Sequence, residues 1–300
     1  MVEAVGPGLS DFIKAATQAC LDGLLNGALY ALIGMGLALI FGVMRIVNFA
    51  HGAFLMLGMY ASWVLFDRLQ INPYLGFIPA GLLLFAFGLL VYTGLIRPIR
   101  NRSDFMQILM TTGISLILVD SIQLKFGADY HQTNLELVNR VVHLGRFTLN
   151  AASLLSFAIA AVLIIALQQF VVRSRTGQAL RAIAQNRDVA PLMGINVTRI
   201  QGISFALGIA LAGIAGGLLL PALYLFPTVG EDYTLKAFVI VVLGGMGSIE
   251  GAAIGGLVLG VTESLTSLWL GNEWALAVDF VLFLLVLSLK PSGIFGRQRA

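Results

Sequence analysis

The sequence has few charged residues and few of the residue types that build enzyme sites. Of its 300 residues, 11% are charged, one is cysteine and three are histidine. A single cysteine, Cys20, cannot form a disulfide within the chain. The histidines His51, His131 and His143 lack helix-facing spacing, and no Cys-x-x-Cys motif accompanies them. We therefore expect no metal-centred or nucleophilic catalysis.

The sequence also lacks a nucleotide-binding P-loop. Such a loop needs Gly-Lys followed by Ser or Thr, because its backbone amides and its lysine hold the phosphates. The chain has four lysines, and each follows an isoleucine or a leucine: Lys14, Lys125, Lys236 and Lys290. The sequence therefore predicts no ATP hydrolysis by this route, no enzyme activity, and no catalytic, cofactor-binding or metal-binding residues.

Apolar residues dominate instead. They make up 58% of the chain, and the mean hydropathy is +0.92. A chain of this length has room for about eight membrane crossings of roughly 20 residues each. The intervening loops are too short for a soluble domain, so residues 1–300 are interpreted as one membrane domain. The 34 glycines suit closely packed membrane helices.

Nine apolar runs predict an all-α, polytopic membrane protein. Each is long enough for most or all of a membrane-spanning helix. The runs cover residues 20–41, 53–66, 75–96, 106–124, 153–172, 202–220, 235–247, 252–270 and 275–289. About eight or nine transmembrane helices are therefore expected, in contact with lipid.

Charged residues orient these spans. Arginine and lysine in short loops mark the inner side of the membrane, and they occur at 97–102, at 173–199 and near the C-terminus, as Lys290, Arg297 and Arg299. Residues 125–152 and 221–234 then lie outside, and counting back places the N-terminus outside too. Because Glu3 precedes the first basic residue, no signal peptide is expected. The net charge of +3 is explained by the inner loops, so no nucleic-acid partner is expected.

The polar segment 174–198 stands out among the loops. One acid, Asp188, faces five arginines: Arg173, Arg175, Arg181, Arg187 and Arg199. Thr176 is predicted to cap a helix whose Leu180, Ile183 and Ala184 share one face. Asp188 is predicted to cap a second short turn that ends at Gly194. A folded, amphipathic inner loop can receive force from a separate motor protein.

Two segments look like interruptions of membrane helices. The first covers residues 42–52 and includes Arg45, Asn48 and His51; the second is the glycine-rich stretch 244–256. Irregular backbone at membrane depth is tolerated where it lines a cavity or is buried in protein. Both segments are candidates for a substrate path, although His51 can also serve only to fix the turn. Gly247, Gly251 and Gly255 are interpreted as helix-packing residues.

Three acids lie in or near predicted spans: Asp120, Glu263 and Asp279. Carboxylates in a membrane face the bundle interior or lie near an interface, and they can form proton or ion relays. Because these three are scattered along the sequence, interhelical hydrogen bonding or a position near a span end is the preferred interpretation.

Several blocks of the sequence carry a family resemblance. They are GALYALIGMGLALIFGVMRIVNFAHGAFLMLGMY at 27–60, TGQALRAIAQNRDVAPLMGIN at 176–196, VLGGMGSIEGAAIGGLVLG at 242–260 and KPSGIFG at 290–296. In these blocks, over nearly its whole length, the chain resembles the LivH-type permease subunits of branched-chain amino-acid ABC importers.

The resemblance implies a set of partners in a bacterial cytoplasmic membrane. These are a homologous LivM-type permease, two cytoplasmic LivG- and LivF-type ATPases, and an extracytoplasmic amino-acid-binding protein. It also implies that the inner loop docks on an ATPase, through Thr176, Gly177, Leu180, Arg181, Ile183, Ala184, Asp188 and Gly194. The candidate substrate path comprises Asn48, His51, Gly244, Gly245 and Ser248.

Other functions remain open at the level of sequence. Relatives of the family handle other amino acids, urea or short amides. An ion-coupled secondary transporter or a channel would explain the spans but not the folded arginine-rich loop. An intramembrane enzyme would need a nucleophile–base pair or metal ligands, and a structural scaffold would not need two interrupted segments.

Overall fold

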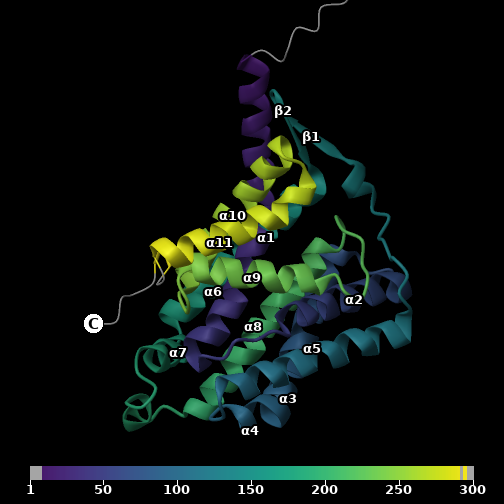
Figure 1. Ribbon diagram of the computed structural model, residues 1–300. Coiled ribbons are helices and arrows are strands. Elements are labelled where there is room, and N and C mark those ends of the chain that lie inside the picture. Colours follow the sequence, from purple (N-terminus) through teal and green to yellow (C-terminus); the bar gives the residue numbers. More distant parts are fainter. Residues whose placement is uncertain (1–8, 291–292, 296–300) are drawn as a thin grey trace, which may run out of the picture.

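The computed structural model describes residues 9–290 and 293–295, and most of them belong to helices (Figure 1). The predicted positions Glu3, Arg297 and Arg299 lie outside these residues. The main helices are α1 (Leu9–Met44), α2 (His51–Leu69), α3 (Pro73–Val91), α5 (Asp104–Phe126), α6 (Ala151–Arg173), α7 (Arg175–Gln185), α8 (Val197–Leu219), α9 (Gly230–Gly244), α10 (Ile249–Trp269) and α11 (Ala275–Leu289). Short helices are η1 (Tyr92–Ile96), α4 (Arg97–Ile99), η2 (Glu136–Asn139), η3 (Ala190–Met193) and η4 (Asn272–Trp274).

The prediction of an all-α, multi-pass membrane protein is confirmed. In the part of the chain that the structure describes, seven helical segments are long and apolar enough to cross a membrane: Ser10–Met44, Pro73–Ile99, Asp104–Phe126, Ala151–Arg173, Val197–Leu219, Ile249–Trp269 and Asn272–Leu289. The two other predicted spans are also helical, as α2 with 19 residues and α9 with 15.

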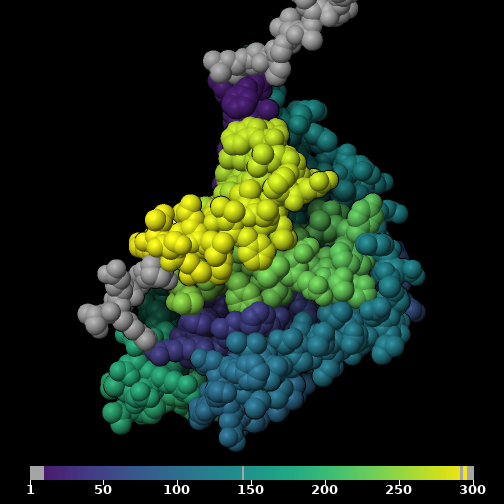
Figure 2. All heavy atoms as spheres, viewed as in Figure 1, coloured from purple at the N-terminus to yellow at the C-terminus, as the bar shows by residue number. Residues whose placement is uncertain are grey.

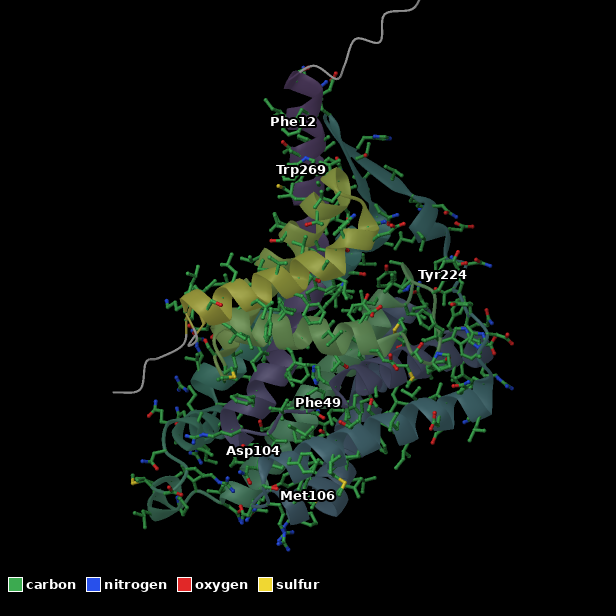
Figure 3. All side chains as sticks on the ribbon, in the orientation of Figure 1. Phe12, Phe49, Asp104, Met106, Tyr224 and Trp269 are labelled. Atoms are coloured by element: carbon green, nitrogen blue, oxygen red, sulfur yellow. The ribbon has the colours of Figure 1, made fainter. Side chains whose placement is uncertain are left out.

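The helix α1 begins well before its predicted start. Its first turns are amphipathic and contain Asp11 and Lys14, so hydropathy alone does not reveal them. Phe12 stacks on Trp269 at the far end of α10, with the ring centroids 6.2 Å apart (Figure 3). This contact supports the extension beyond the apolar run.

The core of the molecule is built around α1 and α8. In the most apolar part of each helix, 89% of residues are buried in α1 and 83% in α8, against 17% in α5 and 11% in the segment containing α11. In the view of Figure 2, α5 and α11 lie along the surface. The peripheral helices therefore present their apolar side chains to lipid or to other proteins.

Glycines allow α1 and α10 to pack closely and antiparallel. A Cβ atom at Gly27 would lie 2.9 Å from the Cα of Leu257, and one at Gly256 would collide with Ala31. On another side of α10, Gly251 and Gly255 meet the end of α9. The packing interpretation is confirmed for Gly251 and Gly255, whereas Gly247 lies in the turn before α10, with a φ of 88°.

The predicted outer segment 125–152 contains a β-hairpin that the sequence reading did not anticipate. Strands β1 (Val141–Leu144) and β2 (Phe147–Asn150) pair antiparallel, with Val141 opposite Asn150. The Gln18 side chain of α1 hydrogen-bonds the backbone of Thr148 as both donor (2.6 Å) and acceptor (3.2 Å). In Figure 1 the hairpin lies at the upper right, and α4 and α7 lie at the lower end.

Candidate functional site

The segment 174–198 folds as a helix followed by a short turn. The helix α7 begins directly after Ser174, whose Oγ accepts a hydrogen bond of 2.9 Å from the backbone N–H of Gly177. The prediction that Thr176 caps this helix is wrong, because Thr176 already lies within its first turn. Gly177 is buried against the carbonyls of Phe170 and Val171, where a side chain would collide. The helix α7 therefore folds back tightly on the end of α6.

The apolar side chains of α7 point into the molecule itself. Leu180 and Ile183 share a face as predicted, each is 2% exposed, and Ala184 is half-buried. They belong to one buried hydrophobic cluster with side chains from the last turns of α1 and from η1, α4 and α8, among them Leu39, Ile40, Val43, Met44, Tyr92, Ile96, Ile99 and Ile200. The prediction that Leu180, Ile183 and Ala184 fill a groove in an ATPase is therefore wrong, because this chain buries the two larger side chains.

The second turn of the segment is capped by a different residue from the predicted one. The side-chain oxygen of Asn186 accepts hydrogen bonds from the backbone N–H groups of Asp188 (3.0 Å) and Val189 (3.2 Å). Asp188 provides no cap to η3, so that prediction is wrong. The turn ends, as predicted, at Gly194, which has a left-handed φ of 76°.

This second turn exposes apolar side chains to solvent. Leu192 is 82% exposed, Met193 78% and Val189 47%. We call these three residues the exposed apolar turn. They form an apolar surface within an otherwise polar loop, and sequence reasoning missed them because it searched α7 for the docking face. Pro191 followed by a glycine in the left-handed region was the available sign of a rigid, projecting turn.

The two arginine-bearing loops, residues 97–102 and segment 174–198, lie at the same end of the molecule. Their arginines form hydrogen bonds within the chain. Arg187 Nη2 donates to Asn101 Oδ1 at 3.2 Å, which joins segment 174–198 to the loop after α4. Arg181 Nη2 donates to the carbonyl of Val172 at 3.0 Å. Arg100 Nη1 donates to Thr198 Oγ1 at 2.8 Å. The side chains of Arg181 and Arg187 are therefore held by hydrogen bonds within this chain.

A pocket of about 510 Å³ lies between the end of α1 and segment 174–198. It is lined by Arg45, Gln185, Asn186, Arg187 and Asp188. Arg45 is exposed and has a left-handed φ of 57°. The end of α7 therefore lies across this pocket from the start of the connection between α1 and α2.

Beyond the exposed Arg45, that connection is buried or half-buried at residues 46–50 and is held by hydrogen bonds. Asn48 and His51 are both 0% exposed. Asn48 Oδ1 accepts from the N–H of Ala50 at 3.2 Å, and His51 Nε2 donates to the carbonyl of Ile33 at 3.0 Å. Phe49 packs on Phe238 of α9 with ring centroids 5.0 Å apart (Figure 3). Asn48 Nδ2 and His51 Nδ1 are buried without a partner among the described residues.

The connection between α9 and α10, residues 245–248, is a glycine turn. Gly245 and Gly247 have φ values of 101° and 88°, which side-chain-bearing residues rarely adopt. Ser248 Oγ caps α10 by accepting from the N–H of Gly251 at 3.0 Å. A Cβ at Gly42 of α1 would lie 3.1 Å from the carbonyl oxygen of Gly247. This glycine turn therefore packs against α1 at Gly42, about one helical turn before Arg45.

Both segments are connections between consecutive helices, which corrects the expectation of interruptions within single spans. The carbonyls of Leu243 and Gly244 accept from the N–H groups of Ile294 (2.9 Å) and Phe295 (3.2 Å). The C-terminal segment therefore covers the end of α9. Gly244 and Gly245 are buried, and Ser248 is half-buried.

The preferred interpretation of the span acids, interhelical hydrogen bonding, is confirmed for Glu263. Glu263 of α10 forms an ion pair with Lys236 of α9 at 2.6 Å, whereas Asp279 is buried on α11 and Asp120 is exposed on α5. A lysine inside an apolar run was the sequence sign that a buried partner was needed, although it did not show which residue that partner is.

Comparison with known proteins gives a match over most of the chain. Residues 19–287 match the family described as branched-chain amino acid transport system / permease component. The chain is 34% identical over 294 residues to the high-affinity branched-chain amino acid transport system permease protein LivH of Escherichia coli, covering 93% of this chain and 95% of that protein. It is 31% identical to the corresponding permease protein BraD of Pseudomonas aeruginosa, with the same coverage.

The fold is also similar to a solved structure, PsaBC from Streptococcus pneumoniae in complex with Fab. The TM-score is 0.55 at 12% identity, and the match covers 95% of this chain and 97% of that one. This likeness concerns the fold alone. With a family match over almost the whole of its helical part, the chain belongs to the branched-chain amino-acid transport system permease family.

Proposed function

We propose that this chain is the translocating subunit of an ABC importer that moves leucine, isoleucine and valine. The observation that carries this proposal is the end-to-end similarity to LivH and BraD permeases. The lack of a P-loop in the sequence supports a non-catalytic role. ATP hydrolysis then belongs to two separate cytoplasmic ATPase subunits, and substrate delivery belongs to an extracytoplasmic binding protein.

In this proposal an ATPase docks on the exposed apolar turn, with α7 transmitting the movement. The large exposure of Leu192 and Met193 supports the docking site. Burying a side chain of that size contributes about 1.5–3 kcal/mol. Leu180 and Ile183 anchor α7 against the end of α1, which supports a rigid link from the ATPase to the membrane helices. Gly177 and Gly194 shape the ends of this link, and Thr176, Arg181, Ala184 and Asp188 belong to it.

The same link leads to the proposed substrate path. The pocket beside Arg45 places the end of α7 next to the connection 45–50. The spare buried nitrogens of Asn48 and His51 support a path there, because they are hydrogen-bonding groups that a passing zwitterion can use. Gly244, Gly245 and Ser248 shape the neighbouring turn. ATP-driven closure of the ATPases would shift these helix ends and alternate the access of the path.

The permease pairs with a homologous LivM-type subunit in this proposal. The exposed apolar faces of α5, α6 and α11 support a partner or lipid on each of them. Leu109, Leu116 and Ile117 of α5 are between 51% and 66% exposed. The hairpin side of the molecule is left for the binding protein, opposite the arginine-bearing loops.

The test is ATP-dependent leucine uptake by proteoliposomes that contain the full complex, with Leu192→Asp in the exposed apolar turn. We expect uptake and ATPase co-purification to fall at least tenfold. Leu69→Asp is the matched control, because Leu69 is a 63% exposed leucine at the far end of α2. Full ATPase co-purification with Leu192→Asp would reject the docking surface, and uptake without ATP would reject the importer class.

Competition in the same assay tests the substrate class. Excess isoleucine or valine should abolish labelled leucine uptake, while urea and short amides should leave it unchanged. Uptake that urea, an amide or another amino acid suppresses more strongly than valine does would move the protein to a different substrate within the same importer class.

A further inference from the structure

The pocket beside Arg45 has an entirely polar lining with an excess of positive charge. Its volume is about 510 Å³, and it lies where α7 packs beside the end of α1 (Figure 1). Arg45 lines it from the end of α1, and Gln185, Asn186, Arg187 and Asp188 line it from segment 174–198. Two arginines against one acid leave the lining with a net positive charge. We call this pocket the arginine socket.

The two arginines of the socket are not neutralised by the acid that lines it. The ion pairs of the described residues all involve other side chains, so Asp188 pairs with neither Arg45 nor Arg187. Arg187 Nη2 donates to Asn101 Oδ1 at 3.2 Å, which fixes the side chain and uses one of its five N–H groups. Asn186 Oδ1 accepts from two backbone N–H groups, which leaves its amide N–H groups to donate. The socket therefore offers the charge-assisted donors that a carboxylate needs.

The backbone of Arg45 is strained. Its φ of 57° lies in the left-handed region, which glycine adopts freely but which is unfavourable for a residue with a side chain. The N–H of Arg45 donates to the carbonyl of Phe41 at 2.8 Å, so α1 ends through backbone atoms alone. A glycine at this position would end the helix with less strain. Such strain is typical of positions whose side chain has a function, and the side chain of Arg45 lies in the socket.

The socket adjoins the proposed docking surface and is remote from lipid tails. The apolar part of α1 is almost fully enclosed by other helices, so the end of α1 is surrounded by protein. Val189, the first residue of the exposed apolar turn, directly follows Asp188 of the socket. A protein docked on the exposed apolar turn therefore lies beside the socket.

We propose that the socket receives an acidic side chain of the docked ATPase, an aspartate or glutamate whose carboxylate lies between Arg45 and Arg187. This inference rests on the proposed function, because it names the chemistry of the partner at that docking surface. The exposed apolar turn supplies contact area, while complementary charge determines which partner docks and how fast it associates. Arg45 is also the first residue of the connection 45–50, so the ion pair gives the ATPase a direct hold on the proposed path, in addition to α7.

Binding of the purified ATPases to the complete permease in nanodiscs tests the proposal. Arg45→Glu should weaken binding about tenfold, because it places like charges together. Arg45→Gly should also weaken binding, while the melting temperature of the permease stays the same or rises, since glycine relieves the left-handed φ. An arginine with only a structural role would instead lower the melting temperature when it is replaced. Arg68→Glu is the matched control, because Arg68 is an 80% exposed arginine at the far end of α2 and should leave binding unchanged.

Cross-linking identifies the acidic partner. Arg45→Lys keeps the positive charge and introduces an amine that a zero-length carbodiimide reagent couples to a carboxylate in direct contact. We expect a cross-link from position 45 to one aspartate or glutamate of the ATPase, which mass spectrometry of the joined peptides then locates. A cross-link that stays within the permease would overturn the proposal.

The socket and the docking surface can fail separately. Loss of ATPase binding in Leu192→Asp, with full binding in Arg45→Glu, would reject the socket and keep the docking surface. Stabilisation of the wild type by anionic phospholipid that Arg45→Glu abolishes, again with full ATPase binding, would assign the socket to a lipid headgroup and overturn the proposal. Failure of the ATPases to bind the wild-type permease would reject the proposed function and the socket with it.

Discussion

The helix α7 and the turn η3 are neighbours in one loop, yet they use their apolar residues in opposite ways. Leu180 and Ile183 of α7 are buried in the permease, while Leu192 and Met193 of η3 are exposed. An amphipathic helix in an inner loop is therefore not by itself a docking surface. Its apolar face can anchor the loop to its own chain, and in the proposed complex the short turn that follows contacts the ATPase.

Leu180→Asp should have the largest effect on this arrangement. A carboxylate placed among Val43, Met44 and Ile99 is buried without a partner and should cost about 3–5 kcal/mol. Thermal unfolding of the purified permease should show the loss without any ATPase present. Leu192→Asp, at an exposed site, should leave the melting temperature within a degree or two. Equal melting temperatures of the two variants would contradict the assignment of Leu180 as a buried anchor and of Leu192 as an exposed contact.

Substitutions at Asn48 and His51, in and beside the connection between α1 and α2, should have an intermediate effect on stability. His51→Leu removes the additional bond to the carbonyl of Ile33, which keeps its partner within α1, and should cost about 0.5–1.5 kcal/mol. If the turn lines the path, His51→Leu and Asn48→Leu should also lower the maximal uptake rate more than the apparent affinity, which the binding protein sets. Uptake in proteoliposomes with saturating binding protein measures this. Unchanged rates in assembled complexes would leave both residues as turn-fixing groups only.

Removal of the side chain that caps α7 should have a smaller effect on stability. Ser174→Ala removes the acceptor for the N–H of Gly177 and should destabilise the helix by about 1 kcal/mol. Thr176→Ala should have almost no effect, since Thr176 is not the cap. Hydrogen exchange of the first turn of α7 compares the two variants. Faster exchange in Thr176→Ala than in Ser174→Ala would contradict the cap assignment.

The spans could be predicted from the sequence because the membrane imposes long apolar runs. All nine predicted runs coincide with helices, and the packing role of Gly251 and Gly255 followed from their spacing. The polar start of α1 and the hairpin of 141–150 carry no such hydropathy signal, so they were not foreseen. Hydropathy marks contact with lipid, not contact between loops.

The candidate sites were harder to predict, for a physical reason. The pattern of Leu180 and Ile183 correctly indicated a buried face, but periodicity does not say which surface buries it. The hydrogen bonds of Lys236 with Tyr30 and Glu263 join side chains of α1, α9 and α10 that are far apart in the sequence. Such contacts exist only once the helices pack, so a single sequence could not show them.

Cysteine labelling most directly tests the claim that α7 anchors the loop while the exposed apolar turn contacts the ATPase. In a Cys20→Ser background, single cysteines at Leu180 and Leu192 would be exposed to a small thiol reagent, with and without the ATPases. We expect Leu192→Cys to be labelled rapidly in the permease alone and to be protected by the ATPases, and Leu180→Cys to be labelled slowly in both states. Rapid labelling of Leu180→Cys in the permease alone, with protection by the ATPases, would contradict this account and restore α7 as the docking face.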